Sequence, residues 1–313
     1  MKRTNRTYVL IALGLCALLA GATVAHAASN KSAVSKGATW IRKARMSTFP
    51  GTGFQSDTVS ALAAARKAGV KVSSSTVARF VDELKKNTTQ YVGGAGPTGK
   101  LMLAVVASGN NPRCFGPVGE RSDLYNILMS DYDEKSGQFG STVYDHALAL
   151  LALKAVHQKI PSKAVKFAKD RRGQYGWSFG MSAKAGDDVE STAIMIEALR
   201  AAGVSKKDGG LKSAYKWIGY QRNSDGGFNP DGPQLQTQAD TTAYAIRAAD
   251  ALGINNSKAK TALRALQQKN GGFRSSPSAK GDYMGISTAN GVLALSGQHY
   301  PVVVRSKAGA SCV

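Results

Sequence analysis

Six copies of one sequence unit span the chain, and this repeat limits the fold more than any other feature. Each copy places a glycine near an aromatic residue, then a polar stretch, then a helical pattern that opens with small residues; only the second copy, with GGAG from Gly93, lacks the aromatic. The helical patterns start at Asp57, Gly99, Asp145, Ser191, Thr241 and Ser287, which are 42, 46, 46, 50 and 46 residues apart. This regular spacing predicts a repeat architecture.

A second helix precedes each glycine signature, and it is clearest at residues 211–221, where apolar residues follow helical spacing. The later helix of each unit is rich in alanine and apolar almost all round, which indicates burial on most sides. Six such pairs that close into a ring bury every inner helix. We therefore predict one all-α domain, an (α/α)6 toroid over residues 38–297, with a linker at 28–37 and a C-terminal tail at 298–313.

The first 27 residues have the pattern of a secretory signal peptide. Lys2, Arg3 and Arg6 precede an apolar run at residues 8–20, and Ala25-His26-Ala27 resembles a cleavage site. The run is shorter than the roughly 20 residues that span a bilayer. We expect cleavage after Ala27, a secreted or extracytoplasmic protein, and no transmembrane anchor in the mature chain.

The chain is strongly basic. Its formal net charge is +21, and loss of the three cationic residues of the signal leaves +18. A charge of this sign favours anionic polymers or surfaces. No nucleic-acid-binding motif is present, so we expect no nucleic acid partner and regard an anionic cell-envelope polymer as a possible one.

Two cysteines remain after cleavage, Cys114 and Cys312. An even number of cysteines in an oxidising compartment predicts a disulfide between them.

The repeats resemble those of the prenyltransferase and squalene-cyclase superfamily, in which glutamine, glycine and an aromatic recur before an inner helix. The segments that carry this resemblance are QRNSDGGF at 221–228 and QQKNGGF at 267–273. The segments at 99–116 and 141–153 are similar to the intrinsic factor and transcobalamin branch and its bacterial relatives. This resemblance implies a noncatalytic toroid that binds a small molecule, either cobalamin-like or lipid-like, with a corrinoid as a possible cofactor. In the carriers, a second β domain completes the corrinoid site, so we expect either a different ligand here or a partner that supplies this domain.

The superfamily also contains enzymes. Class II terpene cyclases protonate an alkene with the middle acid of a DxDD motif, and Asp188-Val189-Glu190-Ser191 matches it in part. Asp188 and Glu190 are therefore weak catalytic candidates in a terpene cyclase acting on an isoprenoid or lipid. Two points oppose this alternative: such enzymes usually place the site between two helical domains, and isoprenoids are made inside cells. The ligands of a zinc prenyltransferase and the GCGEQ signature of thioester domains are missing, and we predict no metal site.

In a closed ring the starts of the inner helices meet at one mouth, and this mouth is the predicted ligand site. Its predicted members are the polar or aromatic residues at these starts: Asp57, Tyr144, Asp145, His146, Asp188, Glu190, Asp240, Tyr244, Asp282 and Tyr283. Serine, threonine and aspartate at a helix start also cap backbone amides. For Asp240, and for Asp188 and Glu190, capping is the simpler interpretation, and His146 is either a ligand contact or an ordinary polar helix start.

Overall fold

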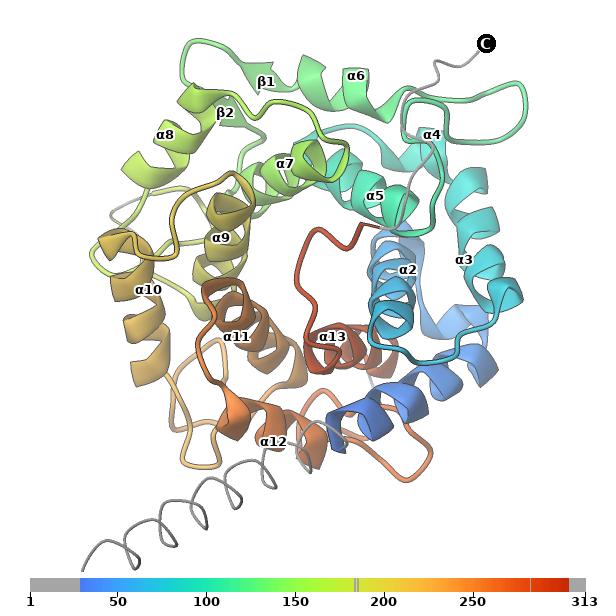
Figure 1. The fold of residues 1–313 in the computed structure, drawn as a ribbon, viewed down its shortest axis with the longest axis vertical. Helices are drawn as coiled ribbons and strands as arrows, with labels where there is room; N and C mark the ends of the chain where they lie inside the picture. The colour runs from blue at the N-terminus through green and yellow to red at the C-terminus, as the bar shows by residue number, and fades with distance from the viewer. Residues whose placement is uncertain (1–28, 183, 185, 282, 304–313) are drawn as a thin grey trace, which may run out of the picture.

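The structure, a computed structural model, describes residues 29–303 except 183, 185 and 282. Its helices form two concentric rings (Figure 1). The inner ring contains α2 (Gly51–Lys67), α5 (Ala95–Ala107), α7 (Val143–Ala155), α9 (Val189–Ala201), α11 (Ala239–Leu252) and α13 (Met284–Leu295). The outer ring contains a helix at 29–43, α3 (Ser74–Lys86), α6 (Leu124–Ser130), α8 (Ser162–Asp170), α10 (Gly209–Tyr220) and α12 (Ser257–Ala265).

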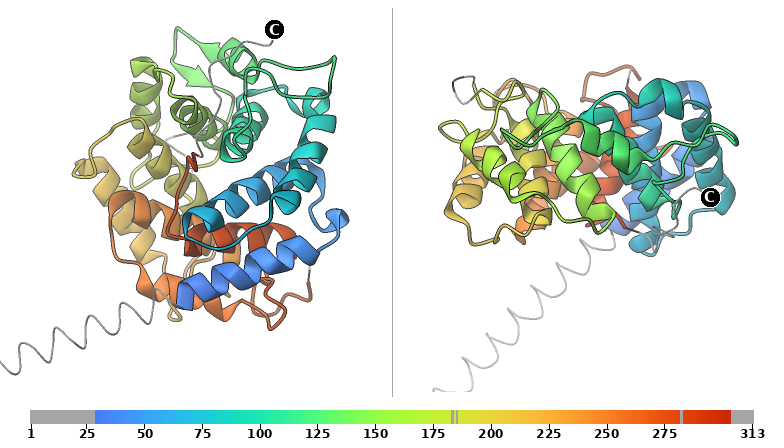
Figure 2. Two further views of the ribbon diagram at one scale, coloured as in Figure 1. Left: turned by 45° about the vertical axis from the view of Figure 1, so that its right-hand side comes forward. Right: turned by 90° about the horizontal axis from the view of Figure 1, so that it is seen from above.

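The inner ring is closed. Each inner helix packs against the inner helix before it and the one after it, and α13 packs against α2. The short elements α4 (Thr88–Tyr91) and η1 (Met46–Thr48), and an antiparallel pair of strands, β1 (Tyr132–Asp133) and β2 (Gln138–Phe139), lie in the connections. The predicted (α/α)6 toroid is therefore confirmed. Seen from above, the molecule is flatter than it is wide (Figure 2).

The element boundaries differ from the predicted ones in two places. Residues 29–37, predicted as a linker, belong to the first outer helix. The inner helices begin two to six residues before the predicted starts, so the column of small residues lies within the helices. At Thr192, Thr242 and Asp240 this shift replaces capping by contacts to the turns and to the neighbouring helix, whereas Asp145 still takes part in a capping box.

In three of the repeats, one threonine fixes the glycine turn that precedes its own inner helix. The aromatic of the turn is almost fully buried, and its backbone N–H donates to the threonine hydroxyl at 2.9 to 3.0 Å. These bonds join Trp177 to Thr192, Phe228 to Thr242, and Phe273 to Thr288. Turn and inner helix thus form one unit, and these aromatics pack the repeat.

Glycine permits the close approach of two inner helices. A Cβ added at Gly99 of α5 would lie 2.9 Å from the backbone carbonyl of Leu148 on α7, and backbone cannot move aside as a flexible side chain can. We expect Gly99→Ala to lower the free energy of unfolding by about 1 to 3 kcal/mol, measured by urea denaturation.

Gly219 is the matched control for that substitution. It lies in outer helix α10, and a Cβ added there would meet no atom within 4 Å, so Gly219→Ala should raise stability by up to about 1 kcal/mol. Equal effects of the two substitutions would show that the α5–α7 contact has no special steric demand.

The segment after α13 turns into the ring. Residues 298–303 run inside the circle of inner helices (Figures 1 and 2). Tyr300 is 4% exposed and Val302 is 2% exposed. Part of the predicted C-terminal tail is therefore core, and it occupies the middle of the toroid.

None of the helices in the described part of the chain has the length and apolarity that crossing a bilayer requires. Residues 1–28 lie outside the described residues, so the signal peptide, its cleavage and secretion stay predictions. Cys312 also lies outside them, and the Cys114–Cys312 disulfide likewise stays a prediction.

Candidate functional site in the centre of the ring

Acidic side chains gather at the N-terminal end of the inner ring. Glu190 and Asp240 are each the second residue of an inner helix, α9 and α11. Each carboxylate accepts a hydrogen bond from a hydroxyl on the next inner helix, Glu190 from Thr241 at 2.6 Å and Asp240 from Ser287 at 2.9 Å. The repeat thus places the same acid-to-hydroxyl contact twice around the ring.

Asp240 is not a helix cap. The residue at the cap position of α11 is Gln238, and no side chain caps that helix. The second oxygen of Asp240 accepts from the Asn290 amide at 2.7 Å, so both oxygens are turned toward α13. The capping interpretation fails because the helix begins two residues earlier than the sequence pattern suggests.

The environment favours protonation of both acids. Burial raises the pKa of Asp240 above its usual 3.8, although the bonds from Asn290 and Ser287 oppose the change. Burial also raises the pKa of Glu190, against the effect of the Thr241 bond and with the help of the nearby negative charge of Asp240.

Two ion pairs lie deeper in the ring. Lys100 of α5 contacts Asp57 of α2 at 2.9 Å. Arg247 of α11 contacts Glu197 of α9 at 3.2 Å, and both side chains are fully buried. Burial lowers the pKa of Lys100, but attraction to Asp57 together with smaller contributions from Tyr244 and Tyr300 raises that pKa overall. The pKa of Arg247 is raised in the same way, with Glu197 as its main partner.

Arg247 is also bound to amide and aromatic groups. Its Nη1 lies 3.3 Å from the Asn290 amide oxygen, and its guanidinium lies 4.2 Å from the centroid of the Tyr244 ring. Its Nη2 is buried and has no hydrogen-bond partner within the described part of the chain.

Tyr144 packs against Tyr244 with ring centroids 6.0 Å apart, and Lys100 lies over the Tyr144 ring.

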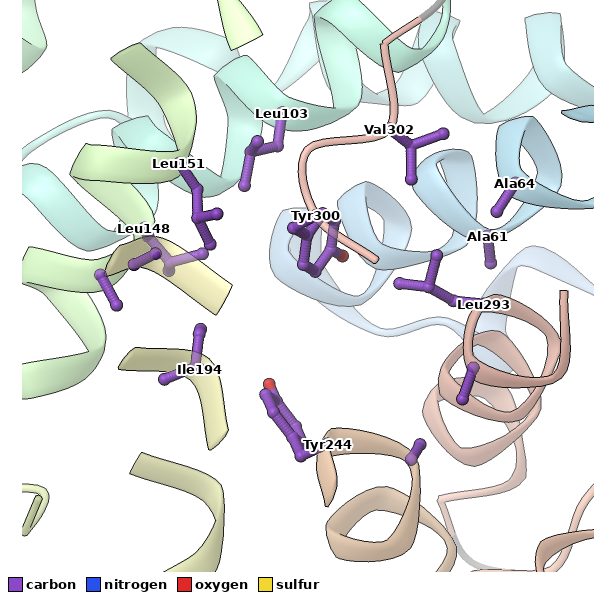
Figure 3. Close-up of a cluster of buried hydrophobic side chains, with 14 of the residues drawn as sticks. Ala61, Ala64, Leu103, Leu148, Leu151, Ile194, Tyr244, Leu293, Tyr300 and Val302 are labelled. Carbon is purple, nitrogen blue, oxygen red and sulfur yellow. The ribbon is translucent and has the colours of Figure 1, made fainter. Parts of the chain in front are cut away.

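Apolar side chains surround this polar set. Leucine, isoleucine and alanine side chains from several inner helices point toward the middle of the ring, where Tyr300 and Val302 lie (Figure 3). We call the following residues, together with this apolar lining, the central site: Asp57, Lys100, Tyr144, Glu190, Glu197, Asp240, Tyr244, Arg247 and Asn290. It combines aliphatic and aromatic surface with a few fixed charges, as small-molecule sites commonly do.

Some predicted site residues lie elsewhere. Asp145 forms a capping box with Thr142 at the start of α7, and Asp188 caps α9 by accepting from the Ser191 N–H. Tyr283 is 69% exposed before α13, and Asp282 lies outside the described residues. Asp57, Tyr144, Glu190, Asp240 and Tyr244 are the predicted residues that come together in the central site.

His146 faces away from the central site. Its Nδ1 accepts the Phe139 N–H at 3.1 Å, and its Nε2 lies 3.0 Å from the Ala164 carbonyl, so the ring bridges β2 and outer helix α8. The ring packs between Phe139 and Phe167. His146 therefore takes the place that threonine holds in three other repeats, and its role is structural.

The central-site contacts that the sequence patterns did not predict are Lys100, Glu197, Arg247, Asn290 and Tyr300. Glu197 and Arg247 are charged residues inside otherwise apolar inner helices, 50 residues apart like the starts of their helices. Aligning all six inner helices by register would have revealed this pair. Nothing in the repeat pattern places Tyr300 inside the ring.

Within residues 29–303, apart from the three omitted positions, no cluster of histidine, cysteine, aspartate and glutamate could hold a metal ion. No protein-family model matches the chain, and no curated protein sequence matches it.

Solved structures do match the fold. One is a single-substitution variant of the type II terpene cyclase MstE from Scytonema in complex with geranylgeranyl dihydroxybenzoate (TM-score 0.62, 15% identity), covering 88% of this chain and 98% of that one. A second is ent-copalyl diphosphate synthase from Streptomyces platensis (TM-score 0.54, 16% identity), covering 79% of this chain and 50% of that one. A third is Candida albicans protein geranylgeranyltransferase-I complexed with GGPP (TM-score 0.56, 15% identity), covering 88% and 96%.

These structures are α/α toroids of the prenyltransferase and squalene-cyclase superfamily, so the predicted resemblance is confirmed at the level of fold. The match to the Scytonema enzyme covers nearly all of that chain, which shows that one toroid is enough for a type II terpene cyclase. The usual arrangement of two helical domains therefore does not decide against an enzyme here.

Proposed function

We propose that the toroid binds an isoprenoid or a similar lipid in its central site. The observation that carries this proposal is the composition of the site: an apolar, aromatic interior with charged groups at fixed positions on the inner helices. Two of the matched structures contain isoprenoid compounds, one a geranylgeranyl dihydroxybenzoate and the other GGPP. Their fold supports the lipid-like half of the sequence-based prediction.

A corrinoid and an anionic cell-envelope polymer have weaker support. A corrinoid is a large macrocycle with polar groups around its edge, whereas the charged groups of the central site are fixed in two ion pairs within an aliphatic and aromatic interior. The basic charge of the chain is the only observation in favour of the polymer. Both remain predictions from the sequence.

Thermal unfolding with a ligand panel tests the proposal. Squalene and geranylgeranyl diphosphate, delivered in detergent, should raise the unfolding midpoint; at a concentration one hundred times Kd, the stabilisation is about 2.7 kcal/mol. Cobalamin serves as the comparison ligand and should leave the midpoint unchanged. A midpoint that rises with cobalamin and with neither isoprenoid would contradict the proposal.

Proton-initiated cyclisation is a second candidate function, and Asp240 is the observation in its favour. Its carboxyl lies at the mouth of the central site, and burial raises its pKa, as protonation of an alkene requires. A proton passed from Asp240 to an alkene carbon would leave a carbocation, which ring closure and loss of a proton would then quench. Arg247 and Lys100 are each neutralised by a paired carboxylate. Binding needs only the lining of the site, whereas cyclisation also needs proton transfer from Asp240, and for this reason we place binding first.

Product analysis by gas chromatography with mass spectrometry separates the two functions, because a cyclised product has the mass of its substrate and is distinguished by its retention. If the protein is a cyclase, Asp240→Asn should lower turnover of squalene or geranylgeranyl diphosphate by a factor of about 10² to 10⁴. Asp188→Asn is the matched control, since asparagine also caps a helix and Asp188 contacts only the backbone of α9 among the partners seen. Equal loss in both variants would remove Asp240 as the acid, and no product from the wild type would leave binding as the function.

A further inference from the structure

Tyr300 is held in the central site by three polar contacts, each to a different inner helix. Its hydroxyl donates to Asp57 Oδ1 at 3.2 Å, and its backbone N–H donates to Glu197 Oε1 at 3.1 Å. Its ring lies under the Arg247 guanidinium, 5.1 Å from centroid to Cζ. The inner helices thus contact the phenol side chain of Tyr300 at its hydroxyl and at its ring face, and they also accept the backbone N–H of the same residue.

Val302 continues this arrangement on the apolar side. It is buried near Ala61, Ala64 and Leu293 on α2 and α13 (Figure 3). Residues 298–303 therefore present a hydroxylated ring followed by aliphatic surface, and the ring of inner helices provides matching polar and apolar surfaces.

Simple filling of the core does not explain the charges around Tyr300. Burial of charged groups carries a large desolvation penalty, and well-packed apolar residues of similar size commonly stabilise a fold as well or better. Here Asp57, Glu197 and Arg247 all turn toward the interior, and Arg247 keeps one buried nitrogen without a hydrogen-bond partner in the described chain. Such a set is better suited to recognising a polar group than to holding the ring closed.

We propose that residues 298–303 are a built-in ligand of the central site, and that the lipid which replaces them carries a phenolic head group bound where Tyr300 now lies. This inference rests on the proposed isoprenoid binding and adds the head group to it. Asp57 accepts the hydroxyl of the ligand, Arg247 covers its ring, and a second hydroxyl can donate to Glu197 in place of the Tyr300 backbone. The isoprenoid chain takes the apolar surface that Val302 covers.

Competition with the segment has a measurable consequence. The apparent affinity of a ligand falls by the fraction of molecules in which its site is open. A substitution that weakens the hold on the segment should therefore tighten lipid binding, whereas a surface substitution should not.

Two lipids with the same chain separate head-group recognition from chain binding: geranylgeranyl hydroquinone and geranylgeranylbenzene, which lacks both hydroxyls. Binding is measured on the whole chain in wild type, Tyr300→Ala and Tyr220→Ala, the last being a control tyrosine that is 66% exposed on α10. We expect the hydroquinone lipid to bind Tyr300→Ala at least ten-fold more tightly than it binds wild type or Tyr220→Ala. On the Tyr300→Ala variant, the Kd of the hydroquinone lipid should be at least ten-fold lower than the Kd of geranylgeranylbenzene.

In the Tyr300→Ala background, where the bond between Tyr300 and Asp57 is already absent, Asp57→Asn tests the hydroxyl contact: it should weaken binding of the hydroquinone lipid and leave that of geranylgeranylbenzene unchanged. Hydrogen exchange at residues 298–303 of the wild type should rise when that lipid binds. If Tyr300→Ala does not fold, Tyr300→Phe keeps the ring and loses only the bond to Asp57, and it should bind the hydroquinone lipid several-fold more tightly than wild type.

Each of the other results of these binding experiments would contradict one part of the proposal. Equal binding of both lipids refutes the phenolic head group while leaving isoprenoid binding intact. Unchanged protection of residues 298–303 with lipid bound refutes their displacement. No binding of either lipid to any variant refutes the isoprenoid proposal itself.

Discussion

Arg247→Leu is expected to lower the free energy of unfolding by about 3 to 5 kcal/mol. The substitution leaves Glu197 fully buried without its ion-pair partner, and an uncompensated buried charge is among the most destabilising changes in a protein. It also removes the cation that lies between the rings of Tyr244 and Tyr300. Urea denaturation followed by circular dichroism measures the change.

The double variant Glu197→Met with Arg247→Leu is the control, because it removes both charges and keeps a similar volume. It should recover most of the loss, and the coupling between the two positions should be several times the effect expected for distant sites. A single substitution with an effect below about 1 kcal/mol would mean that water reaches Glu197, and that the ring is more open at this depth than the structure shows.

The fold could be predicted because turn residues, helix composition and spacing all recur with the same repeat. Glycine turns, alanine-rich helices and a steady period all indicate the same unit, and only a closed ring buries six such helices. Residue roles were harder to predict, since a helix boundary that moves by two residues changes what a side chain contacts. Asp240 shows this effect: as a helix start it is a cap, and as the second residue it contacts Ser287 and Asn290 on the neighbouring helix.

The central site depends on contacts between repeats, which the pattern of a single repeat does not contain. Glu197 and Arg247 meet because the ring sets α9 beside α11 in register. Tyr300 follows the last repeat and has no counterpart in the others, so no periodicity predicts its position. The contacts specific to the central site of this toroid therefore come from residues that differ from the repeat pattern.

His146 is such a departure, and it should make stability depend on pH. Burial lowers its pKa from 6.5 to about 4, against the raising effect of its bond to Ala164. The Phe139 N–H also points at Nδ1, so a proton there would face another donor. Between pH 6.5 and 4, His146 is protonated in the unfolded chain and neutral in the folded chain. The contribution of neutral His146 is therefore complete above pH 6.5 and declines as the pH falls, by about 3 kcal/mol over this window.

Chemical denaturation at several pH values, compared with His146→Thr, isolates this effect, because other titrating groups are common to both proteins. Threonine is the residue that other repeats use to bind the turn N–H, so the variant should fold, with lower stability at about pH 7 and a shallower decline toward about pH 4. His157→Gln, at an exposed position, should follow the wild-type curve. Parallel curves for wild type and His146→Thr would mean that His146 gains its proton in the folded chain as easily as in the unfolded one, and that its cage of Phe139 and Phe167 opens to water.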